Sequence, residues 1–95
     1  MGKMAQIEEN REAIRKIAAA HGSTSIAVFG SVARGTDTDD SDVDFLVDFA
    51  PGSSLFDLLR IQDALESLLG CPVDVVSAGG LTDRDDHIRR EAVPL

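Results

Sequence analysis

The stretch "GSVARGTDTDDSDVDF", residues 30–45, joins two apolar segments and holds much of the polar chemistry of the chain. The apolar run before it ends in Gly30-Ser31, and the apolar run after it opens on Asp42-x-Asp44. Three interpretations fit such a stretch: a phosphate site completed by metal ions, an EF-hand-like calcium loop, and a solvated acidic loop. The segments on either side bear on the choice between them.

Apolar periodicity outside this stretch predicts alternating helices and strands. A repeat near 3.6 residues with polar caps is typical of a helix, and strict alternation is typical of a half-buried strand. The order α-β-α-β-α-β-α follows, with helices at 5–21, 55–69 and 82–92, a short helix from 31, and strands at 25–29, 43–49 and 72–77.

These elements predict a single α/β (α+β) domain over residues 1–95, with a three-stranded mixed sheet and helices packed on one face. Only a turn-rich segment separates strands 25–29 and 43–49, so we expect them to be antiparallel. A full helix joins strands 43–49 and 72–77, so we expect them to be parallel with a right-handed crossover. The second face of the sheet is then open, and function is expected there.

The composition indicates which kinds of binding partner and which cellular compartment to expect. A formal net charge of −8 argues against direct nucleic-acid binding, which relies on Lys and Arg, yet it allows a phosphate substrate if cations lie between carboxylates and phosphates. The single cysteine, Cys71, can form no internal disulfide, so a core position in a reducing cytoplasm is expected. No signal peptide and no run of membrane-spanning length is recognisable, so no membrane partner is expected.

Three aspartates are predicted to share the open face. Asp42 and Asp44 are two apart on a strand, so their carboxylates project to the same side. Asp74 is flanked by two inward-facing valines on the neighbouring parallel strand, so it projects to that side as well. Like charges this close repel unless a cation binds, and oxygen ligands suit Mg²⁺ or Mn²⁺. A pair of ions is the arrangement that a carboxylate triad favours.

Gly30 and Ser31 supply the second half of the predicted site. A glycine at a strand end lets the backbone approach a phosphate closely. A helix that begins at Ser31 directs N–H groups and a hydroxyl at the same point. Because the two strands are antiparallel, the end of the first lies beside the start of the second. A phosphate cradle and the carboxylates are therefore expected at one edge of the sheet.

The rival interpretations account for less of the pattern. "GSVARGT" is similar to a Walker A loop but lacks its lysine. An EF-hand loop starting at Asp37 and Asp39 needs Gly where Asp42 stands and Glu where Asp48 stands. A solvated acidic loop accounts for Asp37, Asp39 and Asp40, but not for three aspartates that share a sheet face.

At this point the residues resemble a known superfamily. Gly-Ser, ten residues, then Asp-x-Asp, with a third Asp on a later strand, resembles the DNA polymerase beta-type nucleotidyltransferases. The fuller pattern "GSVARG", "SDVDFLV", "VDVV" and "IRREAVPL" is similar to the minimal nucleotidyltransferase (MNT) family, over nearly the whole chain. The resemblance implies the nucleotidyltransferase fold, ATP as substrate and two Mg²⁺ or Mn²⁺ ions. Family members of this size are often antitoxins paired with a HEPN-domain ribonuclease toxin, and some adenylylate a toxin tyrosine.

The resemblance also implies roles for the aspartates. Asp42 and Asp44 would hold both metal ions. Asp74 would hold the catalytic ion and help to deprotonate the acceptor hydroxyl. Attack at the α-phosphate would release pyrophosphate.

For the nucleotide, the resemblance implies that Gly30 and Ser31 hold the β- and γ-phosphates. Arg34 could reach the triphosphate or the acceptor, and a surface position on its short helix is the alternative.

Three functions stay open from the sequence. The first is a metal-dependent nucleotidyltransferase that acts on a hydroxyl of a partner HEPN toxin, with a tyrosine as the expected acceptor. The second is an antitoxin that neutralises its partner by contact alone. The third is a transferase that acts on a small hydroxylated molecule, which the shortness of the chain disfavours.

Overall fold

A four-stranded mixed sheet forms the centre of the computed structural model, which describes every residue except 1, 39 and 82. The strands lie in the order β3-β2-β1-β4, with β1 at Ser23–Phe29, β2 at Val43–Phe49, β3 at Val73–Ser77 and β4 at Val93–Pro94. β1 and β2 are antiparallel and β2 and β3 are parallel, as predicted. The prediction of three strands was wrong, because the two-residue β4 pairs antiparallel with Ala27 and Val28 of β1.

The helices agree with the predicted order but not with every predicted boundary. They are α1 (Lys3–Glu9), α2 (Arg11–Ala20), α3 (Gly30–Arg34), α4 (Leu55–Leu69) and α5 (Asp86–Glu91), with 3₁₀ turns η1 (Ala78–Gly80) and η2 (Asp83–Asp85). The single helix predicted at 5–21 was wrong, since it is divided at Asn10, whose φ of −105° and ψ of 12° leave the helical region. The helix predicted at 82–92 contains only six residues of α-helix, and its predicted first residue lies outside the described part of the chain.

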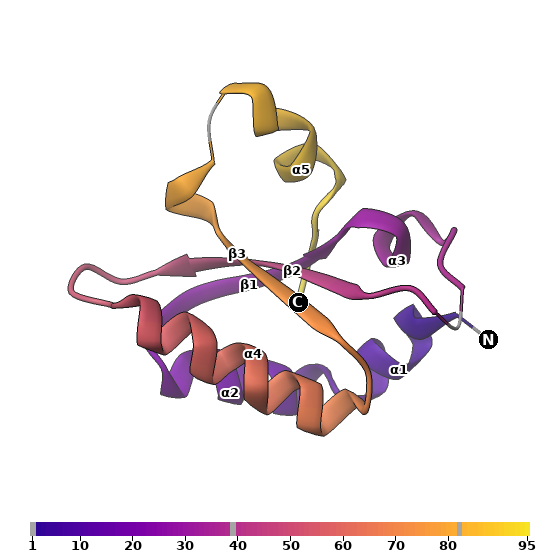
Figure 1. The fold of residues 1–95 in the computed structure, drawn as a ribbon, viewed down its shortest axis with the longest axis horizontal. Coiled ribbons are helices and arrows are strands. Elements are labelled where there is room, and N and C mark those ends of the chain that lie inside the picture. The colour runs from indigo at the N-terminus through magenta and orange to yellow at the C-terminus, as the bar shows by residue number, and fades with distance from the viewer. Residues whose placement is uncertain (1, 39, 82) are drawn as a thin grey trace.

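Helices lie on both sides of the sheet (Figure 1), which corrects the prediction of one covered face. Helices α2 and α4 lie below the sheet in this view and cover the core, in which Val43, Phe45 and Val47 of β2 are buried. On the opposite side, α5 and the 3₁₀ turns stand above part of the sheet. Leu46 points to that side and is only 8% exposed, so the second face is covered over the middle of β2.

Helix α4 illustrates how local sequence sets an element of this fold. Ser54 and Asp57 form a capping box at its start, in which the Ser54 N–H donates to Asp57 Oδ2 at 3.0 Å. Ile61, Leu65 and Leu69 repeat at four-residue intervals and are buried against the sheet. The helix ends at Gly70, whose φ of +69° suits glycine.

The acidic loop before β2 is partly structural. Asp37 Oδ2 accepts a hydrogen bond from the Lys3 backbone N–H at 3.0 Å, so this side chain caps the start of α1. Thr38 N–H donates to Ser41 Oγ at 2.9 Å, which closes the turn that leads into β2. Asp37 is therefore not merely solvated, Asp40 is exposed, and Asp39 lies outside the described residues. Among the described helices, none is long and apolar enough to cross a membrane.

Candidate active site

Asp44 and Asp74 lie directly opposite each other on two neighbouring strands. The parallel register of β2 and β3 pairs Asp44 with Asp74 and Phe45 with Val75. Since Phe45 and Val75 are buried, the two aspartates project from the other face. Asp42 is exposed and immediately precedes β2. The strand alternation of the sequence correctly indicated the common face of Asp44 and Asp74.

Gly30 brings the backbone against the Asp44 carboxylate. Its φ is +76°, a conformation that side chains with a Cβ rarely adopt, and a Cβ placed there would collide with Asp44 Oδ2. The residue starts α3 directly after β1, and Ser31 follows it in the first turn. The antiparallel register sets Phe29 opposite Asp44, which places the end of β1 beside the start of β2. The backbone of Gly30 therefore lies against Asp44, as expected, and Ser31 is the next residue of α3.

The electrostatics of Asp44 reflect this crowding. Burial raises the pKa of the Asp44 carboxyl, and the negative charges of Asp74 and Asp42 raise it further. The nearby Arg34 guanidinium acts in the opposite direction and lowers this pKa. The charges at the start of β2, in β3 and in α3 therefore all act on the Asp44 carboxyl.

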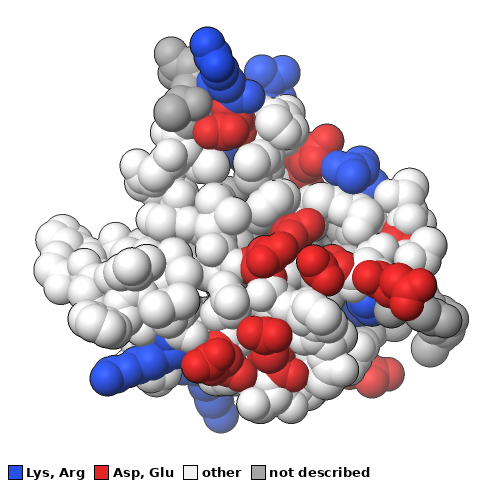
Figure 2. All heavy atoms as spheres, in the orientation of Figure 1, with Lys and Arg blue, Asp and Glu red and all other residues white. Residues whose placement is uncertain are grey.

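Acidic side chains gather over the middle of the molecule and toward α3 in Figure 2, whereas the end where β2 stops and α4 begins is uncharged on this face. The chain from 49 to 56, "FAPGSSLF", carries no charged residue. On this face, acidic side chains lie over the middle of the molecule and also over α4, and the uncharged segment lies at one end.

The nucleotidyltransferase domain family matches this chain over residues 7–93. The chain belongs to this family. A relative named "Putative protein adenylyltransferase MJ0435", from Methanocaldococcus jannaschii, is 40% identical over 94% of this chain and 97% of its own length. "Protein adenylyltransferase MntA" from Thermococcus cleftensis is 47% identical over 63% of this chain and 61% of its own length.

Solved structures confirm the nucleotidyltransferase fold. One described as a "putative minimal nucleotidyltransferase" is 46% identical, covers 100% of this chain and 97% of its own, and superimposes with a TM-score of 0.88. A toxin–antitoxin structure with AMP-PNP superimposes with a TM-score of 0.76 at 23% identity, over 90% of this chain and 71% of its own. That second likeness concerns the fold alone.

The nucleotidyltransferase family implies a divalent metal and a nucleoside triphosphate, and the donor chemistry of the candidate site fits both. Asp42, Asp44 and Asp74 offer only oxygen ligands, which Mg²⁺ and Mn²⁺ prefer. Within the described residues, however, no three His, Cys, Asp or Glu side chains are arranged ready to hold a metal ion.

The charge of Arg34 reaches the candidate site, but the ion pair that this side chain forms is with α5. Its Nη1 donates to Glu91 Oε2 at 2.9 Å, and this ion pair links α3 to α5. Sequence reasoning singled out Arg34 but missed Glu91. The two residues are 57 positions apart, and no periodic pattern relates them.

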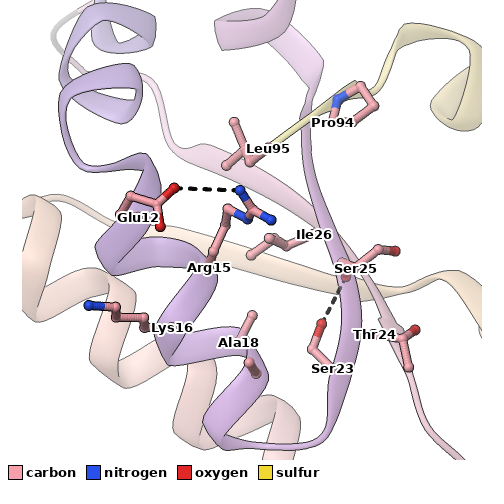
Figure 3. Close-up of a pocket in the computed structure, with 11 residues that line it drawn as sticks. Glu12, Arg15, Lys16, Ala18, Ser23, Thr24, Ser25, Ile26, Pro94 and Leu95 are labelled. Carbon is pink, nitrogen blue, oxygen red and sulfur yellow. Dashed lines mark hydrogen bonds and ion pairs between the residues drawn. The ribbon is translucent and has the colours of Figure 1, made fainter.

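A cavity of about 410 Å³ lies away from the carboxylates, between α2, β1 and β4 (Figure 3). Arg15 extends over its centre toward Ile26 and Leu95, and Ser25 lies at its rim. None of the candidate site residues lines it. We assign the chemistry to the carboxylates rather than to this hollow, because the carboxylate edge combines acidic ligands with a close backbone approach.

Proposed function

We propose that this nucleotidyltransferase transfers AMP from ATP to a hydroxyl of a partner protein, and that the partner is a HEPN-domain toxin whose action is thereby suppressed. The observation that carries the proposal is the meeting of Asp44, Asp74 and the Gly30 backbone at one edge of the sheet. The names of the relatives, protein adenylyltransferases, support the reaction class. Toxin–antitoxin structures among the proteins that share the fold support the kind of partner.

Asp42, Asp44 and Asp74 would hold two Mg²⁺ or Mn²⁺ ions. When bound, such ions stabilise the charge on the entering and leaving oxygens of an in-line displacement. Burial, followed by the charges of Asp74 and Asp42, raises the pKa of Asp44, and a bound cation would favour the ionised carboxylate against these effects.

The other residues would bind, orient and move a proton. Backbone N–H groups at Gly30 and Ser31 would hold the β- and γ-phosphates, and the Arg34 guanidinium would offset their charge. The oxygen of the acceptor hydroxyl forms a bond to the α-phosphorus while the bond from that phosphorus to the pyrophosphate oxygen breaks. Asp74, which is exposed, would accept the hydroxyl proton.

The surface of the chain favours a protein acceptor. Asp42 and Asp74 are both exposed, so a large partner can approach them directly. The net charge of −8 favours a basic partner, as expected of a ribonuclease. A single, half-buried Cys71 fits a cytoplasmic setting.

The test is incubation with ATP labelled on the α-phosphate, with Mg²⁺, with and without the product of the adjacent gene. Label on the partner protein supports the proposal, and Asp44→Asn is the inactive control. A partner that is neutralised equally well by the Asp44→Asn variant would establish inhibition by contact alone. Label recovered only on a small molecule would refute the protein acceptor.

A further inference from the structure

The ion pair between Arg34 and Glu91 joins two elements that are distant in the sequence. Arg34 is in the last turn of α3, and Glu91 ends α5 just before β4. Nη1 of Arg34 lies 2.9 Å from Oε2 of Glu91. The side chains are 50% and 34% exposed, so a ligand in solvent can reach the arginine while the pair is formed.

The Arg34 guanidinium also acts on the candidate site. Its positive charge lowers the pKa of Asp44, against the raising effects of burial, Asp74 and Asp42. Asp44 in turn lies against Gly30, at the start of the same short helix. The guanidinium therefore lies in the field of the carboxylates where a triphosphate is proposed to bind.

A guanidinium can serve two anions at once. It has five N–H donors in a rigid planar fork, and the contact with Glu91 engages one of its terminal nitrogens. Donors on the other edge of the fork can face phosphate oxygens without breaking that contact. A carboxylate that holds one edge also restricts the rotamers of a long side chain, which reduces the entropy that is lost on ligand binding.

We propose that Glu91 is a positioning residue that holds Arg34 so that the free edge of its guanidinium faces the polyphosphate of the nucleotide. This inference rests on the proposed function, since it needs a triphosphate at Gly30-Ser31. It gives α5 a role in nucleotide binding that goes beyond covering the sheet. If Glu91 instead competed with phosphate for Arg34, removal of Glu91 would strengthen the binding of Mg·ATP rather than weaken it.

The test is calorimetric titration of Mg·ATP into the whole chain and four variants: Arg34→Ala, Glu91→Ala, Glu91→Gln and the Arg34→Ala/Glu91→Ala double variant. Glu91→Ala should weaken binding by about two- to fivefold, the range expected for an exposed ion pair. Glu91→Gln retains an oxygen acceptor, so its affinity for Mg·ATP should stay within about twofold of that of the wild type. If the negative charge of Glu91 were required, Glu91→Gln would lose as much affinity as Glu91→Ala. In the Arg34→Ala background, Glu91→Ala should have no further effect.

A matched control removes the same charge elsewhere. Glu12 forms a comparable exposed pair with Arg15 at 3.5 Å, and Glu12→Ala should leave the affinity for Mg·ATP unchanged. Thermal melting of each variant checks that it is folded.

Four results would overturn the proposal, and they are distinguishable. Tighter binding by Glu91→Ala and Glu91→Gln would establish competition. An equal loss with and without Arg34 would show that Glu91 acts on the fold alone. Arg34→Ala with wild-type affinity would remove the arginine from the site but leave the proposed function standing. Failure of the wild type to bind Mg·ATP would instead refute the proposed function itself, and this inference with it.

Discussion

Asp44 lies where three segments of the chain meet. Strand β2 carries it, Asp74 of β3 lies opposite it, and the Gly30 backbone packs against its carboxylate. It is partly buried among like charges, which explains the direction of its pKa. The ionised Asp44 carboxylate therefore lowers the stability of the fold, and it lies where the proposed reaction needs it.

Asp44→Asn is expected to reduce nucleotide transfer by about 10²- to 10³-fold, the effect of losing one group that stabilises charge in a transition state. The amide keeps the size of the side chain but lacks the charge that would bind a cation. Transfer of label from ATP to the partner measures this. Wild-type transfer by the variant would show that the catalytic site lies elsewhere.

The same variant is expected to be more stable than the wild type near neutral pH. Because the pKa of Asp44 is raised in the folded state, its contribution to stability is complete below the ordinary value of 3.8 and is lost as the pH rises through the raised value. Above that range the ionised carboxylate destabilises the fold, and asparagine removes this cost. Urea unfolding at about pH 7 should give Asp44→Asn a higher free energy of unfolding than the wild type, and at about pH 4 this difference should be smaller. An equal gain at both would contradict the assignment.

Gly30→Ala is expected to destabilise the fold and to reduce ATP binding. The positive φ of +76° alone costs a residue with a Cβ about 1–2 kcal/mol, and the methyl group would also push against Asp44 Oδ2. Gly52 has a positive φ of +91° and open space around it, so Gly52→Ala is the matched control for backbone strain. Chemical denaturation and ATP titration of both variants should separate strain from the effect on the site, since only Gly30→Ala should lose affinity for ATP.

Among single residues, those placed by strand alternation could be predicted. The common face of Asp44 and Asp74 follows from the two-residue period and the parallel register. The pairing of Arg34 with Glu91 could not be predicted, because it depends on where α5 returns over the sheet. The contact of Asp37 with the Lys3 backbone escaped prediction for the same reason: it is a tertiary contact between segments 34 residues apart.

At the scale of elements, helix α4 has one face buried in the core and one face exposed to solvent. Ile61 is 0% exposed and Phe56 is 71% exposed. Ile61→Ala should lower the free energy of unfolding by about 2–5 kcal/mol because it leaves a cavity in the core. Phe56→Ala should change it by less than about 0.5 kcal/mol. Urea denaturation measures both, and a large loss for Phe56→Ala would show that its ring is buried in solution.

Elements with strong local signals matched their predicted bounds. The strand at 43–49 and the helix at 55–69 agree with β2 and α4 residue for residue, since alternation and a capping box delimit them. Strand β4 was missed because two residues, one of them a proline, are too short to show a period. The break at Asn10 was missed because the apolar positions Ile7, Ile14 and Ala18 stay in helical phase across it.

At the scale of the molecule, the two ends of the sheet differ in chemistry. Three aspartates and the Gly30 backbone lie toward the end where β2 begins. At the other end, an exposed Asp48 accepts a hydrogen bond from Ser25 Oγ and is followed by the uncharged segment 49–56. The helices beneath the sheet leave the carboxylate edge accessible, with Asp42 and Asp74 exposed. A protein that docks at that edge would exclude water from the site and strengthen its electrostatics.

The acceptor is expected to be a tyrosine of that docked partner. This chain contains no tyrosine, so it cannot modify itself on that residue. Transfer requires the acceptor oxygen to be held within about 3–3.5 Å of the phosphorus, and a protein docked over the exposed aspartates can supply both the hydroxyl and this alignment. Mass spectrometry after reaction with ATP, Mg²⁺ and the partner should find one or more AMP units on a partner tyrosine. Changing that tyrosine to phenylalanine should abolish the modification without weakening the complex, whereas label that persists on a serine, a threonine or this chain would contradict the expectation.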